Sequence, residues 1–136
     1  MRVELNKTGY FTHPDCWKHE MGEGHPECPE RLSAIESRLQ ASALNGLLDR
    51  REAQPAPVAD IGLAHGRMYV ASIRGLTDVL REEINAGGPT HTQVDPDTAL
   101  NVYTWDAALR AAGAALAAVD AVMAGEINNA FCAIRP

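Results

Sequence analysis

Apolar residues recur at helical spacing in three parts of the chain. Steps of three and four residues place side chains on one face of a helix. They predict a helix that begins near Pro29, a second over about Arg67–Ala86 and a third that follows Thr104. Thr104 is the predicted N-cap of the third helix and Gly125 its predicted stop. The predicted buried stripe of this helix comprises Trp105, Leu109, Ala112, Leu116, Val119 and Met123.

Two shorter segments predict β-strands near the ends of the chain. Residues 7–12 resemble a short strand, and Ala130–Ile134 is a continuous apolar run, typical of a parallel strand that is covered on both faces. Proline, glycine and polar residues predict loops over 13–28 and 90–101, and a connector over 51–57 with room for a very short strand. This mixture of strands and helices predicts an α/β layered fold.

The predicted last strand lies at the very end of the sequence. A buried strand needs neighbours that pair its backbone groups and layers that cover its faces. Only Arg135 and Pro136 follow this strand, so no later element of the sequence can cover it. We therefore expect residues 1–136 to be the front part of a longer domain.

Composition narrows the functional classes. The 136 residues carry a net charge of −6, which argues against a basic face for nucleic acid or an anionic membrane. No apolar run approaches the ~20 residues that span a bilayer, and residues 1–7 lack the apolar stretch of a secretory signal. The three cysteines form no disulfide framework, so we expect reduced thiols in a cytoplasmic protein.

Five potential zinc donors lie within the predicted loop over residues 13–28. They are His13, Cys16, His19, His25 and Cys28. Their spacing matches no zinc-finger or ribbon pattern, and the chain has no second paired half. An ordinary polar loop is therefore the favoured interpretation, and a structural metal site at Cys16, His19 and Cys28 is the alternative.

Arg31 and two aspartates are further candidates for chemistry. Arg31 lies in the first turn of its predicted helix, where a cation opposes the helix dipole. Pairing with a carboxylate or access to an interior channel would explain this position, and a solvated arginine beside Glu27 and Glu30 is the alternative. Asp95 and Asp97 flank a proline, where they could bind a cation, accept substrate N–H groups or cap a turn.

Four stretches, in order, resemble the histone deacetylase and acetylpolyamine amidohydrolase family. Residues 24–32 (GHPECPERL) resemble its Gly-His-Pro-Glu-x-Pro-x-Arg-Leu signature, and residues 95–98 and 105–113 resemble a loop and the helix that follows it. Residues 128–136 (NNAFCAIRP) resemble the strand that leads into its Arg-Pro-Pro-Gly-His-His motif. The sequence is most similar to bacterial members that are related to the class II deacetylases.

The resemblance implies the arginase/deacetylase fold, a three-layer α/β/α sandwich with a mainly parallel sheet, present here as an incomplete N-terminal fragment. It implies a zinc-dependent hydrolase that removes acetyl groups from lysine side chains, polyamines or other small amines. Arg31 matches the arginine that lines the family's internal cavity, and Asp97 matches a rim residue that binds the substrate backbone. Arg135 and Pro136 match the approach to the catalytic histidine pair and have no predicted chemical role.

The family's catalytic residues and its zinc ligands would follow Pro136. We therefore expect residues 1–136 to be part of a single deacetylase domain that is truncated before the histidine pair, inactive alone and without the catalytic zinc. The alternative is a non-catalytic protein, either a homo-oligomer that covers the last strand or a metal-binding module built on residues 13–28.

Overall fold

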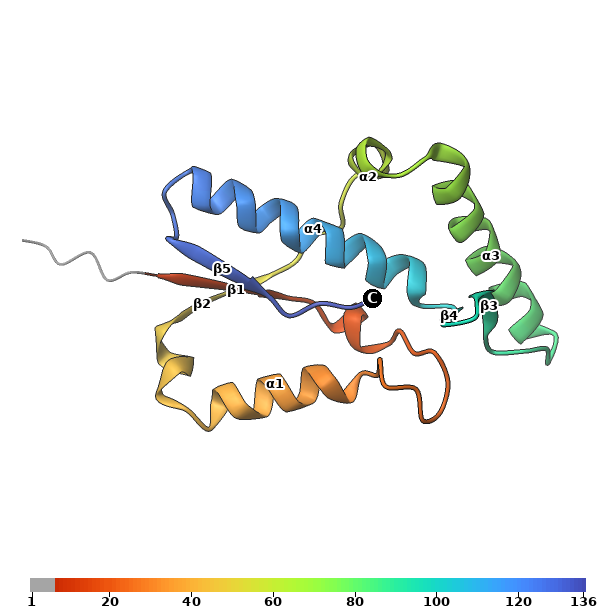
Figure 1. Cartoon of the computed structure of the whole chain (residues 1–136), viewed down its shortest axis with the longest axis horizontal. Helices are drawn as coiled ribbons and strands as arrows, with labels where there is room; N and C mark the ends of the chain where they lie inside the picture. Colours follow the sequence, from red (N-terminus) through yellow and green to blue (C-terminus); the bar gives the residue numbers. More distant parts are fainter. Residues whose placement is uncertain (1–6) are drawn as a thin grey trace, which may run out of the picture.

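A parallel β-sheet forms the centre of the computed structural model, which describes residues 7–136 (Figure 1). The strands are β1 (Thr8–Thr12), β2 (Leu48–Glu52) and β5 (Asn129–Cys132), in the order β2-β1-β5. The register pairs Thr8 of β1 with Leu48 on one side and with Asn129 on the other. The strand predicted over residues 7–12 is confirmed as β1. The expectation that residues 1–7 lack a secretory signal concerns residues of which only Lys7 is described.

Helices cover both faces of the sheet, as the α/β/α prediction requires. Helix α1 (Glu30–Gln40) lies on one face and helix α4 (Thr104–Met123) on the other (Figure 1). Successive side chains of a strand point to opposite faces, so Tyr10 and Phe11 belong to different cores. One core contains Tyr10, Cys16, Leu32 and Ala133. The other contains Phe11, Ala53, Ala114, Ala118, Ala121 and Ile127.

Helix α4 packs on the sheet through small residues, so the predicted buried stripe is wrong. Leu116, Val119 and Met123 are 41%, 61% and 81% exposed. The residues buried instead are Ala107, Ala111, Gly113, Ala114, Ala118 and Ala121. Small side chains let the helix axis approach the neighbouring backbone, and the amide of Ala56 donates a hydrogen bond to Leu109 O at 2.9 Å.

One of the two predicted ends of α4 is confirmed. Gly125 adopts a φ of +73°, and its amide donates to Val122 O at 3.0 Å, as in a Schellman motif. At the other end, Thr104 is the first helical residue and its side chain does not cap the helix. The nearby polar contact comes from Asn101, whose Oδ1 accepts a hydrogen bond from Tyr103 N at 3.1 Å.

The central part of the chain holds elements that differ from the predictions. The segment 90–101, predicted as a loop, contains an antiparallel hairpin, because two short strands pair across the turn at Asp95–Thr98. Strand β2 begins three residues before the predicted connector. The predicted first helix appears as α1, and the second is confirmed as α3 (Arg67–Asn85). The remaining elements are η1 (Pro14–Trp17), η2 (Ala43–Leu47), α2 (Val58–Ala64), β3 (Thr92–Asp95) and β4 (Thr98–Leu100).

Strand β5 is an edge strand rather than the buried strand predicted over Ala130–Ile134. It pairs only with β1 among the described strands, and Phe131 is 50% exposed although its ring stacks on Tyr10 at 6.2 Å. Burial comes just after the strand, where Ala133 is 2% exposed. Over residues 7–136, none of the helices is long and apolar enough to cross a bilayer.

Candidate functional site

The carboxyl ends of the three parallel strands meet at one edge of the sheet. Residues 13–28 follow β1, the connector at 53–57 follows β2, and residues 133–136 follow β5. In open α/β sheets, ligands commonly bind at this edge. The segments that leave β1 and β5 also carry two of the four family-like stretches, so this edge is the candidate site.

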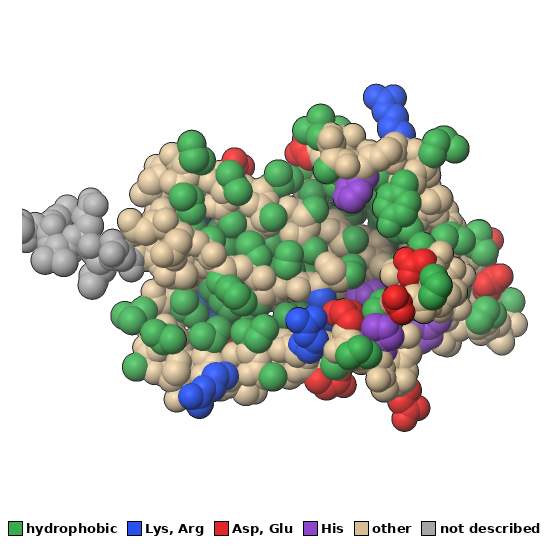
Figure 2. All heavy atoms as spheres, in the orientation of Figure 1, with side chains coloured by type: hydrophobic (Ala, Val, Ile, Leu, Met, Phe, Trp, Pro, Cys, Tyr) green, Lys and Arg blue, Asp and Glu red, His purple; other side chains and the backbone are tan. Residues whose placement is uncertain are grey.

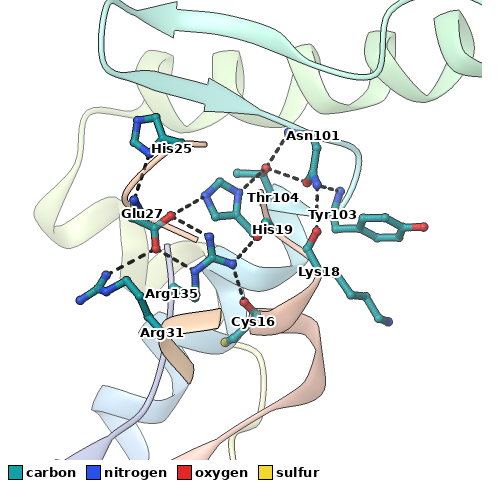
Figure 3. Close-up of polar contacts among 10 residues, drawn as sticks. All are labelled: Cys16, Lys18, His19, His25, Glu27, Arg31, Asn101, Tyr103, Thr104 and Arg135. Carbon is teal, nitrogen blue, oxygen red and sulfur yellow. Dashed lines mark hydrogen bonds and ion pairs between the residues drawn. The ribbon is translucent and has the colours of Figure 1, made fainter. Parts of the chain in front are cut away.

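A buried arginine joins these two segments. Arg135 is 2% exposed and its guanidinium makes a bidentate pair with Glu27, with Nε to Oε1 and Nη2 to Oε2 both at 2.7 Å (Figure 3). Its Nη1 donates to the backbone carbonyls of Cys16, at 3.1 Å, and of His19. Burial alone would raise the pKa of Glu27, but the hydrogen bonds and charge of Arg135 hold it below its usual value. Glu27 is therefore an ionised partner that compensates the buried cation.

His19 is buried beside this ion pair. It is 1% exposed, and its Nδ1 lies 2.9 Å from Thr104 Oγ1 (Figure 3). Its Nε2 lies 3.5 Å from Glu27 Oε2 and has no hydrogen-bond partner among the described residues. Burial, and then the charge of Arg135, lowers the pKa of His19 to about 4. The imidazole is consequently neutral at pH 7.

Thr104 and Asn101 hold His19 against the start of α4. Asn101 N donates to Thr104 Oγ1 at 2.9 Å, and Thr104 Oγ1 donates to Asn101 Oδ1 at 3.1 Å. Asn101 Nδ2 donates to the carbonyl of Lys18 at 2.8 Å. The loop after β1 is therefore held to the segment after β5 by Arg135, and to the start of α4 by the contacts with Thr104 and Asn101.

An apolar cavity of about 870 Å³ opens beside this polar cluster. Side chains of α2, α3, α4 and the β3–β4 hairpin line it, and His19, Glu27 and Pro136 also border it. Trp105, Leu109, Ala112, Leu116 and Val119 of the predicted α4 stripe form part of its wall. Figure 2 shows hydrophobic side chains exposed along α4 on this face. The stripe predicted to face the sheet thus faces the cavity.

The structure places the two residues singled out by the resemblance at the surface. The Arg31 side chain is 61% exposed and its Nη1 lies 3.7 Å from Glu27 Oε1. Arg31 is not among the residues that line the 870 Å³ cavity. Asp97 lies in the exposed turn between β3 and β4, where its amide donates to Asp95 Oδ1 at 2.8 Å. Asp95 therefore caps the turn, while the Asp97 carboxylate stays on the exposed side of the hairpin.

The candidate metal ligands do not converge. Cys16 is fully buried with its Sγ 4.0 Å from Ala107 O, and the Nδ1 of His19 is engaged with Thr104. The Nδ1 of His25 accepts a hydrogen bond from the amide of Glu27 at 3.1 Å. Across residues 7–136, no three His, Cys, Asp or Glu side chains are grouped so as to hold a metal ion, and the three cysteines are free. The geometry does not support a structural metal site at Cys16, His19 and Cys28.

Sequence reasoning missed the Glu27–Arg135 pair. Both residues lie within family-like stretches and have opposite charge, which is the one signal that could have suggested a contact. They are separated by 108 positions, and both belong to irregular segments. No periodicity argument predicts such a contact.

Comparisons with known proteins agree with this architecture. Residues 25–136 match the histone deacetylase domain. The histone deacetylase-like amidohydrolase of Pseudomonas aeruginosa is 35% identical over 113 residues, 83% of this chain and 27% of that protein. Human polyamine deacetylase HDAC10 is 31% identical over 133 residues, 95% of this chain and 19% of that protein. The crystal structure of the HDA15 HD domain superimposes with a TM-score of 0.82 at 23% identity, covering 97% of this chain and 36% of that one.

The chain therefore spans less than a third of the length of these two relatives. The family match covers most of this chain. The parallel sheet between α1 and α4 superimposes on the matched structure, so the two share a fold. The bacterial relative aligns with 83% of this chain. The chain belongs to the histone deacetylase family.

Proposed function

We propose that the protein is the N-terminal part of a cytoplasmic deacetylase domain that hydrolyses the acetyl amides of lysine side chains, polyamines or other small amines. The observation that carries this proposal is the Glu27–Arg135 ion pair, which joins two family-like stretches at the carboxyl ends of the strands. The names of the relatives, an amidohydrolase and a polyamine deacetylase, support the same reaction class. The three free cysteines are in keeping with a reducing compartment.

Two described residues have proposed roles toward substrate and cavity. Asp97, in the exposed turn of the hairpin, would accept N–H groups from the substrate backbone at the rim. Arg31 would reach the internal cavity once further chain surrounds its exposed side chain. The net charge of −6 would favour the approach of a cationic substrate such as a polyamine.

The zinc that the family resemblance implies does not fit the residues described here. Over 7–136 no cluster of suitable donors exists, so we derive no catalytic step through a metal from this chain. In our proposal the metal ligands and the paired histidines belong to sequence that follows Pro136. The 136-residue chain alone is then inactive, and its role is to supply the scaffold, the rim and the support of the site.

Two measurements test the proposal. The genomic sequence downstream of Pro136 should continue with residues close to Pro-Gly-His-His. The extended protein should then hydrolyse an acetyl-lysine peptide or N-acetylputrescine, and should lose activity to a metal chelator, while the 136-residue chain shows none. A reading frame without that motif, an extended protein inactive on both substrates, or an active 136-residue chain would contradict the proposal.

A matched pair of variants tests the role of Asp97. We expect Asp97→Asn in the extended protein to lower kcat/KM by about tenfold or more, because hydrogen bonds to a charged group contribute about 1.5–3 kcal/mol. Asp95→Asn lies in the same turn and keeps the oxygen that accepts from the Asp97 amide, so it should retain activity. Equal effects of the two substitutions would assign the turn, rather than the Asp97 carboxylate, to substrate binding.

A second candidate function, a non-catalytic homo-oligomer, is favoured by one observation. Strand β5 leaves one edge unpaired within the described structure, and Phe131 on it is 50% exposed. Such an edge favours pairing with another chain. Light scattering of the 136-residue protein tests this candidate, because a monomer across the micromolar range would oppose it and a stable dimer would support it.

A further inference from the structure

The end of the segment that follows β5 is held by a side chain rather than by backbone hydrogen bonds in the described structure. The backbone of β5 pairs with β1, and this pairing ends where Ala133 N donates to Phe11 O at 2.9 Å. Thr12 Oγ1 donates to the carbonyl of Ala133 at 2.8 Å. Beyond Ala133, no backbone hydrogen bond holds the chain in the part that the structure describes. The side chain of Arg135 is the anchor of this terminal segment.

Arg135 anchors the segment with four hydrogen bonds to three different residues. Two go to the Glu27 carboxylate, and one each to the carbonyls of Cys16 and His19. A guanidinium is planar and rigid, so a bidentate partner and two carbonyls fix both its position and its orientation. Figure 3 shows the guanidinium enclosed by these groups. The backbone at Arg135 is consequently held at a set distance from the loop after β1.

The next residue borders the apolar cavity. Pro136 lines that cavity together with His19 and Glu27. Glu27 thus both pairs with the guanidinium that holds the chain and borders the cavity that the chain reaches. A change in the ion pair would move the point at which the backbone meets the cavity, while the pairing of β5 with β1 could remain intact.

We infer that Glu27 and Arg135 are positioning residues whose ion pair directs the chain at Pro136 into the cavity. This inference rests on the proposed function, which places the paired histidines shortly after Pro136, behind an expected Pro-Gly. The ion pair then determines where those histidines stand relative to the rim of the site. Neither Glu27 nor Arg135 needs to touch the substrate for this role.

Kinetics of the extended protein test the inference. We expect Glu27→Gln to lower kcat at least tenfold with KM changed less than twofold, since the reacting groups are displaced while the rim is kept. Glu27→Asp, which keeps the charge, should recover part of the loss. Glu36→Gln is the matched control, because it removes another ion pair, to Arg50 at 3.0 Å, and should leave kcat unchanged. A Glu27→Gln enzyme with wild-type kcat would overturn the inference.

Nuclear magnetic resonance on the 136-residue chain tests the positioning without any activity. The wild type should show a protected Arg135 Nε–H signal and nuclear Overhauser contacts between Pro136 and side chains of the cavity. Both should be lost in Glu27→Gln and kept in Glu36→Gln, and Arg135→Lys serves if Glu27→Gln does not fold. Unchanged Pro136 contacts in folded Glu27→Gln or Arg135→Lys would overturn the inference. An inactive extended wild type would instead count against the proposed function alone.

Discussion

Gly113 in the middle of α4 permits the close approach of this helix to the connector after β2. A Cβ atom at this position would lie 1.6 Å from Gln54 O, 2.8 Å from Gln54 C and 2.9 Å from Ala56 N. These are backbone atoms that cannot rotate away, and Ala56 N is hydrogen-bonded to Leu109 O. Since carbon contacts settle at about 3.5 Å or more, Gly113→Ala must displace helix or connector by roughly 2 Å.

The expected cost of Gly113→Ala follows from this displacement. Overpacking of a buried site costs about 1–3 kcal/mol, occasionally more, and α4 here carries the core that includes Ala114 and Ala118. Alanine is the better helix former by about 1 kcal/mol, which offsets only part of the loss. Because the closest contact would be only 1.6 Å, we take the upper end of the overpacking range. After the offset, we predict that the free energy of unfolding falls by about 2 kcal/mol, with a melting temperature lower by roughly 8 °C.

Gly75→Ala is the matched control in a second helix. Gly75 also lies within a long helix, α3, but no atom lies within 4 Å of a Cβ placed there. This substitution should raise the free energy of unfolding by up to about 1 kcal/mol. Urea unfolding followed by circular dichroism measures both variants. A Gly113→Ala protein within about 0.5 kcal/mol of the wild type would refute the reasoning.

The remaining predictions concern buried groups and the outer face of α4. His19 has a folded pKa of about 4 against 6.5 in the unfolded chain, so the unfolded state binds the proton first as pH falls. The free energy of unfolding should drop between pH 6.5 and 4 by up to about 1.4 kcal/mol per pH unit. Urea titrations at several pH values should show a weaker pH dependence in His19→Gln, and a dependence equal to that of the wild type would contradict this prediction. Burial raises the pKa of the Cys16 thiol, so mass spectrometry should find maleimide labelling of Cys16 far slower than that of the partly exposed Cys28; equal rates would show that the core opens. Val119→Ser should change the free energy of unfolding by less than about 0.5 kcal/mol, because Val119 is 61% exposed. Ala114→Val should lower it by about 1–3 kcal/mol, because Ala114 is fully buried. A larger loss for Val119→Ser than for Ala114→Val would instead support the predicted stripe as the buried face.

Patterns local to one segment predicted most of the elements. The periodicity of α3, the helix after Pro29 and the glycine at Gly125 all depend on neighbouring residues, and each appears in the structure. The β3–β4 hairpin was missed because its strands have four and three residues, too few for an alternating pattern. Helix α2 was missed for the same reason, since seven residues make about two turns.

The candidate site was only partly predictable. Motif positions singled out Arg31 and Asp97, and the structure places both at the surface, where their proposed roles stay predictions. The buried cluster of Glu27, His19 and Arg135 was not predicted. Its members come from the irregular segments after β1 and β5, whose paths depend on packing between distant parts of the chain.

The sequence by itself determined the α/β class, the positions of the main helices and the family, because each depends on local periodicity or on motif residues in order. Only the tertiary structure decided which face of α4 meets the sheet. Both faces repeat at helical spacing, and the larger side chains have the stronger apolar signal, yet the alanine face packs because small residues allow close approach. It also decided that Arg135 pairs with Glu27, since a buried cation takes whichever carboxylate the fold brings within hydrogen-bond distance.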